Sequence, residues 1–589
     1  MNNYSIEEAN ILKEIKLFGF KNQRVLSNKM GISLGKVNKL LNNLIEKGYL
    51  NKNKQFTSMS ESLFIDSTLK QAIILAAGCG LRMIPISSDT PKALLAVKDE
   101  VLIERLIKQC KAVGINNIKI VVGFKKEEFE YLMDEYGVDL IVNEEYGIKN
   151  NLKSLSLVDN LENTYVIPSD LYAYDNPFHS FELYPWYMLS NKLSENSDIT
   201  YNHKYECNCI SKSTKGNKMI GIAYFDKEIG IKIKKRLDKF VMDANYDNSF
   251  WEDAAKDNHH FMLYANIVDD HRFYEINTYE QLRIIDDLSI HLNSSVMEIL
   301  CNTFKVDNDE IKNIEAIKKG MTNRSFKFNC KGINYIARVP GEGTQQLINR
   351  KEEYEVYQAI SKIHISDEVK YFDPDTGLKI TRFIENARNA DAENLEDVKL
   401  CMRKLKAFHE CNLKVNHTFN IFEKIDFYEK LWDGKQSVFK DYLITKQKIT
   451  KLKNMIKYLP EKWTLCHIDS VPDNFMFTSN DIKLIDWEYA GMQDAYVDIA
   501  MFAIYSLYNK EQVDQLIEAY FEGNCPIDIR IKIYAYIAIC GLLWSNWCEY
   551  KRFLGVEFGE YALRQYRYAK DYYLIVKEMM GEKFNELCS

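Results

Sequence analysis

The sequence predicts a multi-domain protein with a small α-helical module, an α/β domain and a bilobal α+β domain. The chain has 589 residues, which is more than one hydrophobic core accommodates. In the first half, amphipathic helices alternate with short β-rich segments, a pattern that favours a mostly parallel sheet with helices on both faces. In the second half, a β-rich stretch precedes a long helical region. The predicted domains span residues 1–68, 69–292 and 293–589.

Composition indicates an ordinary globular protein. The apolar fraction is 46%, the charged fraction is 27%, and the formal net charge of −7 gives no global attraction for polyanions. The N-terminus lacks a signal segment, and the most apolar stretch, Tyr534–Trp544, is too short to span a bilayer. The close pair Cys207-x-Cys209 has no second pair to complete a zinc site. We therefore expect a cytoplasmic protein with reduced thiols and no membrane insertion.

The first domain has helical patterns at Ile6–Leu17, Val25–Met30 and Ser33–Lys47, with Gly31 as a tight turn and Gly48-Tyr49-Leu50 leading into a short wing. Up to Lys54 it holds ten Lys or Arg and four Glu, a local charge of +6. It resembles the winged helix-turn-helix modules of bacterial regulators, in which residues 33–44 would read a DNA groove. DNA binding through residues 1–68 stays open beside simple packing on the enzyme or dimerisation.

The second domain begins with a short apolar strand, Ala72–Leu75, that enters a Gly-rich turn. Its further helices are expected at Leu102–Val113 and Glu127–Tyr136, and its further strands at Ile118–Val122, Leu140–Asn143 and Thr164–Ile167. Glycines and polar residues separate these segments, as expected for crossover connections.

The strongest motif of this domain is Leu75-Ala76-Ala77-Gly78-Cys-Gly80-Leu-Arg82-Met-Ile-Pro85, followed by Thr90-Pro91-Lys92. Glycines after a first strand let main-chain N–H groups approach a triphosphate without a Cβ in the way. Arg82 and Lys92 add the positive charge that an attacked α-phosphate and a departing pyrophosphate require. We therefore assign nucleotide binding to residues 75–78 and Gly80, and a catalytic role to Arg82 and Lys92.

This domain resembles the sugar-phosphate nucleotidyltransferase superfamily, whose fold is a Rossmann-like mixed sheet, and most closely its bacterial phosphocholine cytidylyltransferase branch. The matching segments are Gly114-Ile-Asn-Asn-Ile, Val121-Val-Gly-Phe, Asn150-Asn151, Ser169-Asp170-Leu-Tyr172, Phe250-Trp251-Glu252-Asp253 and Tyr274-Glu275-Ile-Asn277. The resemblance implies CTP and phosphocholine as substrates and Asp170 as the main ligand of Mg²⁺. Asp170 also follows an apolar strand, where active sites of such sheets lie.

Two positions depart from the family pattern. Asn277 stands where the family usually has an aspartate that supplies a second metal contact, so its amide oxygen would hold the ion without a full charge. Leu152 and Lys153 stand where the family has aromatic residues. A quaternary ammonium needs π-faces. Tyr172, Tyr201 and Trp251 are the aromatic candidates, with core or rim positions as the alternative.

The third domain contains Cys466-His467-Ile-Asp469-Ser-Val-Pro-Asp-Asn474, followed by Leu484-Ile-Asp486-Trp487-Glu488-Tyr489. This set is typical of γ-phosphoryl transfer to an alcohol. Asp469 can accept the hydroxyl proton, and Asn474 and Asp486 can hold Mg²⁺ on the phosphates of ATP. Five residues separate Asp469 from Asn474, so both can point into one pocket from a single loop.

This domain resembles the choline kinase family, which shares its fold with protein kinases. Gly320-Met-Thr-Asn323-Arg-Ser-Phe326 matches the family's nucleotide-covering hairpin, and Arg338 matches its phosphate-contacting basic residue. The resemblance assigns Asn323, Arg338 and Glu353 to nucleotide binding. Helix spacing alone leaves Glu352 open as the partner of Arg338.

Trp544 and Trp547 lie on one face of a predicted helix and resemble the family's choline-binding pair. With Tyr489 they could form an aromatic box around a trimethylammonium. Glu488 is added to this predicted choline site. Glu549 nearby keeps ethanolamine open as the alcohol, because a primary ammonium prefers a carboxylate.

The two resemblances together predict a bifunctional enzyme. ATP would phosphorylate choline, and CTP would then convert phosphocholine to CDP-choline and pyrophosphate, with Mg²⁺ at both sites. The same chemistries on ethanolamine or an aminoalkylphosphonate are one alternative. A DNA-binding regulator that senses choline metabolites through a weakened transferase domain is another.

Overall fold

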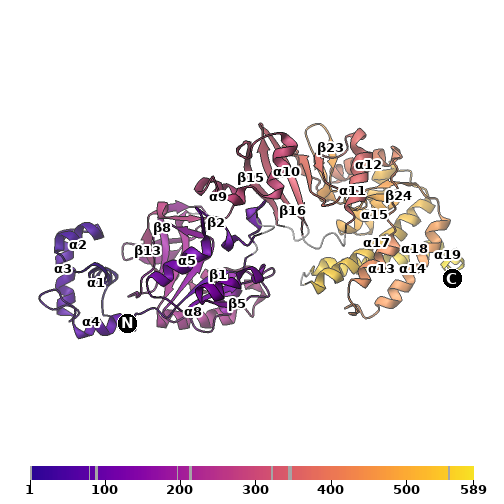
Figure 1. Cartoon of the computed structure of the whole chain (residues 1–589). Helices are drawn as coiled ribbons and strands as arrows, with labels where there is room; N and C mark the ends of the chain where they lie inside the picture. Colours follow the sequence, from indigo (N-terminus) through magenta and orange to yellow (C-terminus); the bar gives the residue numbers. More distant parts are fainter. Residues whose placement is uncertain are drawn as a thin grey trace. The chain divides into compact units, whose positions relative to one another are not determined.

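The computed structural model describes residues 3–78, 80–86, 90–195, 197–210, 215–319, 323–341, 348–554 and 558–588. It divides into two compact units, residues 1–302 with 306–309, and residues 303–305 with 310–589 (Figure 1). The motif segments Gly320-Met-Thr and Cys79 lie outside the described residues. The predicted boundaries after residues 68 and 292 stay predictions.

The first unit begins with a helical module, α1 (Ile6–Phe18), α2 (Gln23–Met30), α3 (Leu34–Glu46) and α4 (Ser58–Asp66). Ser5 and Glu8 form a capping box at α1, and Gly31 ends α2 at φ 65°, which a glycine adopts at little cost. A β-bridge joins Leu50 to Phe56 at the tip of the expected wing. The core of the module also includes Phe181 and Leu183 from the following α/β region.

The α/β region of the first unit is built on a ten-stranded sheet in the order β5-β4-β1-β6-β11-β8-β13-β10-β9, with β12 paired to β13. The strands are β1 (Gln71–Ala76), β4 (Ile118–Val122), β5 (Asp139–Val142), β6 (Thr164–Pro168), β8 (Trp186–Ser194), β9 (Ile199–Tyr201), β10 (Glu206–Cys209), β11 (Gly216–Phe225), β12 (Lys256–Asp257) and β13 (His260–Val268). The first four strands of this order are parallel, and β11 pairs antiparallel with both β6 and β8. The sheet is therefore mixed.

Side chains alternate along β1 and so build a core on each face of the sheet. Ile74 packs in the core under α5 (Leu102–Ala112) and α6 (Tyr131–Tyr136), whereas Ile73 packs in the core under α7 (Asn151–Ser156) and α8 (Lys227–Phe240). The helix expected at Glu127–Tyr136 begins instead as a 3₁₀ turn, Lys126–Phe129.

Shorter elements complete the first unit. A ribbon of β7 (Leu171–Ala173) and β14 (Phe273–Glu275) brings two distant segments of the chain together at the end of β6. The others are β2 (Ala96–Val97), β3 (Glu100–Val101), α9 (Tyr279–Ile285) and α10 (Ser295–Phe304), the last of which ends in the second unit.

The second unit has a small lobe with the five-stranded antiparallel sheet β15-β16-β17-β19-β18. Its elements are β15 (Ile311–Lys319), β16 (Asn323–Cys330), β17 (Ile333–Pro340), α11 (Arg350–Ile360), β18 (Val369–Phe372) and β19 (Lys379–Arg382). Asn349 caps α11 at its start, and a 3₁₀ turn, Ser361–Ile363, directly follows its end.

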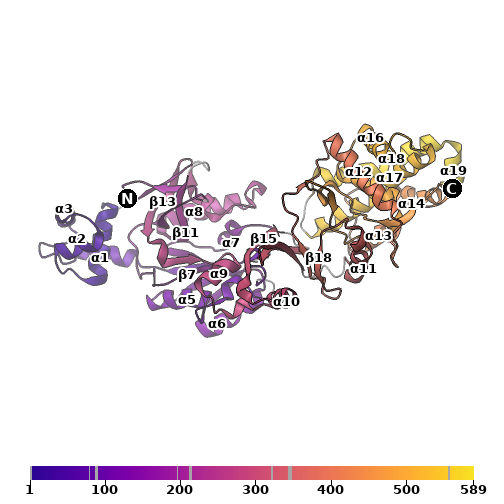
Figure 2. The same cartoon turned by 90° about the horizontal axis from the view of Figure 1, so that it is seen from above.

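The large lobe is helical (Figure 2). It contains α12 (Leu395–Glu410), α13 (Ile421–Lys430), α14 (Tyr442–Tyr458), α15 (Tyr496–Tyr505), α16 (Lys510–Phe521), α17 (Ile527–Phe553), α18 (Glu560–Met580) and α19 (Glu582–Cys588), with the strands β20 (Arg388–Asn389), β21 (Trp463–Cys466), β22 (Phe475–Phe477), β23 (Ile482–Leu484) and β24 (Gly491–Asp494). The apolar stretch within α17 is buried on all sides, as a central helix of a lobe requires. Among the described helices, none is long and apolar enough to cross a membrane.

Candidate functional site

The first candidate site lies where β1 and β6 end in the first unit. Asp170 lies two residues after the end of β6 and directly before β7, and the main-chain N–H of Ile276 donates to the Asp170 carbonyl at 2.9 Å. This bond extends the β7–β14 ribbon and sets Asn277 beside Asp170. Two residues that are more than one hundred positions apart therefore lie beside each other.

Two basic side chains converge on this pair. Lys92 Nζ donates to the Asp170 carboxylate and, at 2.5 Å, to Asn277 Oδ1, while Arg82 Nη2 donates to the same Asn277 oxygen at 3.3 Å. Asn277 Nδ2 in turn donates to Glu275. Because one ammonium reaches both oxygens, Asp170 and Asn277 lie close enough to share a single cation.

The glycine-rich turn has room beside it. A Cβ on Gly78 would meet no atom within 4 Å, and Gly80 has φ 57° at the start of the following 3₁₀ turn. On the adjacent strand end, a Cβ on Gly123 would come within 2.8 Å of the Ala77 carbonyl. Glycine at 123 therefore allows the close approach of two loops, whereas glycine at 78 faces open space.

Trp251 does not present a ring to a ligand, which corrects its prediction as a choline contact. It is 2% exposed and packs against Tyr187 and Phe225 in the core. Its main-chain N–H donates to Asn151 Oδ1 at 2.8 Å. Asn150 likewise donates to the Asn248 carbonyl, so the adjacent residues Asn150 and Asn151 both hold the segment that contains Trp251.

Tyr172 is also unsuited to the predicted choline contact. Its side chain is buried, and the Arg105 guanidinium lies 4.7 Å from its ring centroid. Its ring edge meets Tyr174 in a T-shaped contact. A protein cation thus already covers a π-face of Tyr172, and a second cation there would be repelled.

The second candidate site is the loop after β21 in the second unit. Asn474 Nδ2 donates to Asp469 Oδ2 at 3.2 Å and to the Asp469 carbonyl at 2.8 Å. These bonds turn the Asn474 amide so that its oxygen is directed away from Asp469. Asp486 follows β23 at φ 67°, and His467 Nε2 bonds the Ile485 carbonyl beside it. The three predicted polar residues are therefore held on two linked loops.

A buried aspartate that the sequence analysis missed fixes this loop. Asp498 of α15 accepts from the main-chain N–H groups of His467 and Ile468 at 2.9 and 2.7 Å. His409 Nε2 lies 2.9 Å from Asp498 Oδ2, and its other nitrogen bonds the Tyr520 hydroxyl. Cys466 lies near enough for these residues to resemble a metal cluster, but both His409 nitrogens already have partners. Asp498 is a positioning residue for the loop.

Arg338 and Glu353 meet in the small lobe. Arg338 Nη2 donates to Glu353 Oε2 at 2.6 Å, and Arg338 Nη1 lies 3.4 Å from Asp486 Oδ1. Glu353, not Glu352, is thus the partner of Arg338. The charges of Lys379, Arg338 and Arg350 hold the pKa of Glu353 at about 2 despite its burial. Glu353 therefore stays ionised and orients Arg338 toward the loop of Asp486.

Glu488 forms ion pairs with Arg338 and Arg350, which corrects its prediction as a choline contact. Its Oε2 accepts from Arg338 and Arg350, both at 3.3 Å, and from Asn323 Nδ2 at 3.1 Å. Burial raises the pKa of Glu488 to about 7. Arg350 was not found from the sequence, although its i,i+3 spacing to Glu353 was a usable signal.

The predicted aromatic residues come together on one side of the large lobe. The Trp544 ring centroid lies 6.3 Å from that of Tyr489 and 5.7 Å from that of Trp547. Phe558, which the sequence analysis missed, lies 5.1 Å from Trp547. We call Tyr489, Trp544, Trp547 and Phe558 the ring cluster. Burial raises the pKa of Tyr489, and the nearby Tyr428, Glu488 and Asp469 raise it further.

Glu549 has other partners. Its Oε1 accepts from the Ser437 hydroxyl at 3.2 Å and from the Val438 N–H at 3.3 Å, and its Oε2 lies 3.2 Å from Arg552. It is 4% exposed. This carboxylate therefore already has hydrogen-bond and ion-pair partners within the protein.

Both units are similar to known proteins. Residues 72–176 match the family model of the MobA-like NTP transferase domain, and residues 314–518 match that of choline/ethanolamine kinase. The choline-phosphate cytidylyltransferase of Streptococcus pneumoniae is 33% identical over 223 residues, covering 37% of this chain and 97% of that protein.

Two further proteins resemble one half each. The 2-aminoethylphosphonate cytidylyltransferase of Lancefieldella rimae is 32% identical over 237 residues, covering 38% of this chain and 94% of that protein. The crystal structure of the choline kinase LicA from Streptococcus pneumoniae aligns with a TM-score of 0.42 and 26% identity, covering 48% of this chain and 100% of that one.

Proposed function

Because the chain belongs to the cytidylyltransferase family in its first half and carries a choline/ethanolamine kinase domain in its second, we propose that it makes CDP-choline. ATP phosphorylates choline in the second unit. CTP then reacts with phosphocholine in the first unit, releasing pyrophosphate. We place both reactions in the cytoplasm, where ATP and CTP are supplied.

The observation that carries the proposal is the ring cluster beside the Asp469 loop. Tyr489 lies three residues after Asp486 in sequence, and its ring meets Trp544 of α17. A trimethylammonium among these rings gains cation–π attraction, about 0.5–2 kcal/mol for each face. Its hydroxyl end then reaches toward Asp469, the residue that accepts the hydroxyl proton. Choline fits both ends of this arrangement.

The side chains around each loop suit Mg²⁺. In the second unit, Asn474 donates through Nδ2 to Asp469 and keeps Oδ1 for a cation, and Asp486 adds a carboxylate. In the first unit, Asp170 and Asn277 present oxygens that one cation can share. Hard oxygen donors of this kind are those that Mg²⁺ prefers. The bound ion would neutralise the triphosphate and leave positioning to Arg338, Lys92 and Arg82.

The test is product analysis with choline, ATP, CTP and Mg²⁺. Asp469→Ala should abolish phosphocholine formation, and Asp170→Ala should abolish only CDP-choline formation, each by at least about a thousandfold. The exposed Asp528→Ala and Asp159→Ala serve as matched controls and should leave both steps unchanged. Either active-site variant retaining its own step at the wild-type rate would refute its assignment.

The acceptor of the first unit is the main alternative within this proposal. Three observations leave the acceptor open. Asn277 makes the proposed metal site less negative, and Trp251 and Tyr172 are closed to a ligand. One similar protein is a 2-aminoethylphosphonate cytidylyltransferase. Pyrophosphate release with CTP should be measured with phosphocholine, phosphoethanolamine and 2-aminoethylphosphonate in parallel. We expect the highest kcat/KM with phosphocholine, because only this acceptor is the product of a choline kinase.

A second proposal concerns DNA. In the helical module, five basic residues pair with glutamates, namely Lys13, Lys16, Lys29, Lys36 and Lys47. Within the described part of the module, no ion pair involves the other five, Lys21, Arg24, Lys39, Lys52 and Lys54. These five lie at the start of α2, on α3 and in the wing. We propose that they contact DNA phosphates, since winged modules use these three elements for that purpose.

Lys39 and Lys36 on α3 form a matched pair for testing the DNA proposal. Lys39→Ala should weaken binding to duplex DNA from upstream of the gene about fivefold at low salt and should flatten the salt dependence. Lys36→Ala should have little effect, because Glu7 already neutralises Lys36. Mobility shifts at several salt concentrations measure both. Equal effects of the two substitutions, or no shift at 50 mM salt or below, would reject DNA binding.

A further inference from the structure

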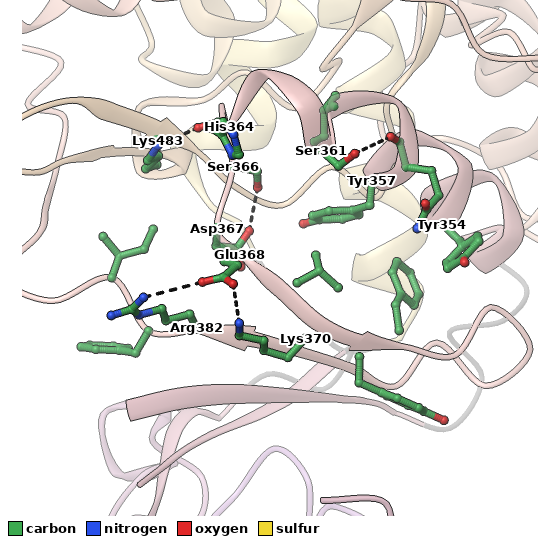
Figure 3. Close-up of a pocket in the computed structure, with 17 residues that line it drawn as sticks. Tyr354, Tyr357, Ser361, His364, Ser366, Asp367, Glu368, Lys370, Arg382 and Lys483 are labelled. Carbon is green, nitrogen blue, oxygen red and sulfur yellow. Dashed lines mark hydrogen bonds and ion pairs between the residues drawn. The ribbon is translucent and has the colours of Figure 1, made fainter. Parts of the chain in front are cut away.

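A cavity of about 810 Å³ opens in the small lobe of the second unit (Figure 3). Its walls come from α11, the following turn to residue 368, strand β18, the end of β19, and Lys483 of β23. Among the described residues, the lining includes none from the Asp469 loop or the ring cluster. The size lies within the range of small-ligand sites, about 300–1,000 Å³. The cavity is therefore separate from the proposed catalytic sites and large enough for a nucleotide.

One wall of the cavity is aromatic. Tyr354 and Tyr357 project from α11, and Phe372 meets both rings edge to face, at 5.5 and 5.8 Å between centroids. Figure 3 shows the Tyr357 ring extending from the helix toward the segment that carries Glu368 and Lys370. Such rings can stack on a planar base or face a quaternary ammonium.

The remaining walls carry mixed charge. Lys370 and Arg382 share the Glu368 carboxylate, Arg382 at 3.7 Å, and Lys483 lies across the cavity. Asp367 accepts from the Ser366 hydroxyl at 2.6 Å. Apart from His364, the lining has three basic side chains, Lys370, Arg382 and Lys483, and two acidic ones, Asp367 and Glu368. A ligand with phosphates and a quaternary ammonium, and one net negative charge, complements this lining.

The cavity connects to the nucleotide site of the kinase through buried contacts. The Tyr357 hydroxyl accepts from Lys379 Nζ at 2.6 Å, and the same ammonium lies 3.2 Å from Glu353 Oε1. Glu353 orients Arg338, which faces Asp486. A ligand that moves the Tyr357 ring therefore changes the support of Arg338, although it touches neither ATP nor choline.

We propose that this cavity binds a pyrimidine nucleoside diphosphate ester, CDP-choline itself, and that its occupancy slows choline phosphorylation. The base and the ammonium meet the aromatic wall, and the diphosphate meets Lys370 and Arg382. The inference rests on the proposed function, because it makes the product of the first unit an effector of the second. Binding at Tyr357 disturbs Lys379 and Glu353, and this lowers kcat of the kinase step without displacing ATP.

The test measures phosphocholine formation from choline and ATP, without CTP, by the intact chain at rising CDP-choline concentration. We expect kcat to fall at least threefold in the wild type, at every ATP concentration. In the double variant Lys370→Ala, Arg382→Ala, the CDP-choline concentration for half of the effect should rise at least fivefold, with unchanged activity in its absence. Both side chains are partly exposed and outside the catalytic site, so folding should tolerate their loss.

Lys351→Ala is the matched control, because Lys351 is an exposed, ion-paired lysine of the same lobe that does not line the cavity. It should respond to CDP-choline as the wild type does. The inference is overturned if CDP-choline has no effect, if all three proteins respond equally, or if the effect disappears at high ATP. No phosphocholine even without CDP-choline would instead reject the proposed function.

Discussion

At the residue scale, Asn277 shows how one substitution changes an ion site. Lys92 and Arg82 both donate to its amide oxygen, so two cations face a group that carries no charge. A carboxylate there would attract both cations and also a metal ion. The amide makes the transferase site less negative than the family pattern implies.

Asn277→Asp should lower the Mg²⁺ concentration for half-maximal pyrophosphate release about fivefold, which corresponds to roughly 1 kcal/mol. The physical reason is the added full charge beside Asp170. Titration of Mg²⁺ at saturating CTP measures the change, and Asn116→Asp, at an exposed loop position of the same unit, is the control. An unchanged or higher half-maximal concentration would show that Asn277 is not a metal contact.

Glu252 is a second residue with an observable electrostatic effect. Its side chain lies beside Tyr187, whose hydroxyl donates to Oε1 at 3.0 Å, while Oε2 is buried without a described partner. Burial raises the pKa of Glu252 from 4.5 to about 7. The folded chain therefore keeps a proton on Glu252 that the unfolded chain releases between these two pH values.

The free energy of unfolding of the first unit should accordingly fall as pH rises from about 4.5 to 7, by on the order of 3 kcal/mol from Glu252 alone. Glu252→Gln removes this contribution, because the amide is neutral at every pH. The check is calorimetric melting at pH 5 and pH 8. The melting temperature of Glu252→Gln, relative to that of the wild type, should be higher at pH 8 than at pH 5. Glu195→Gln, at an exposed position, is the control, and its melting temperature should change with pH as that of the wild type does. If the melting temperatures of Glu252→Gln and the wild type differ by the same amount at both pH values, Glu252 does not have the raised pKa.

At the scale of elements, helix α17 has both a structural role and a proposed binding role. Its 27 residues form the buried centre of the large lobe, and its C-terminal half presents Trp544 and Trp547 to Tyr489. The spacing of the tryptophans predicted their common face. It could not predict Phe558, which reaches the ring cluster from the segment before α18.

Trp544→Ala should raise the KM for choline about tenfold and change the KM for ATP less than twofold, since only choline loses a π-face. Steady-state kinetics with each substrate varied separately provide the measurement. Trp463→Ala, at a half-exposed tryptophan of the same unit, is the control and should change neither constant. Parallel increases in both KM values would mean that Trp544 supports the fold rather than choline.

Other elements show where sequence reasoning was sufficient. The matches to the NTP transferase and choline/ethanolamine kinase families confirm the predicted nucleotidyltransferase and kinase halves. The winged-helix identity of residues 1–68 stays a prediction. The parallel strands β4, β1 and β6 were visible as short apolar segments, whereas the antiparallel pairing of β11 with β6 and β8 depends on contacts between distant segments.

At the scale of the whole molecule, each proposed site is complete within one unit. Every residue assigned to CMP transfer lies in the first unit, and every residue assigned to choline phosphorylation lies in the second. As proposed, neither step uses a described side chain from the other unit. We therefore predict that phosphocholine can pass between separate chains.

A mixture of Asp170→Ala and Asp469→Ala proteins should make CDP-choline from choline, ATP and CTP after a lag, although neither variant does so alone. The lag reflects release of phosphocholine from one protein and its capture by the other. A time course followed by mass analysis measures it, with added phosphocholine expected to remove the lag. Failure of the mixture, with each remaining half-reaction intact, would show that phosphocholine is not released.

The sequence by itself determined the chemistry of this protein, because Asp469 and Asn474 lie in one loop, and Gly78, Gly80 and Arg82 lie in one turn. Short spacing fixes such groups relative to one another. Only the tertiary structure decided that Trp251 and Tyr172 are closed to a ligand, that Glu488 and Glu549 have arginine partners, and that a cavity borders Tyr357. Burial and ion pairing depend on which distant side chains meet, and residue type and spacing do not contain that information.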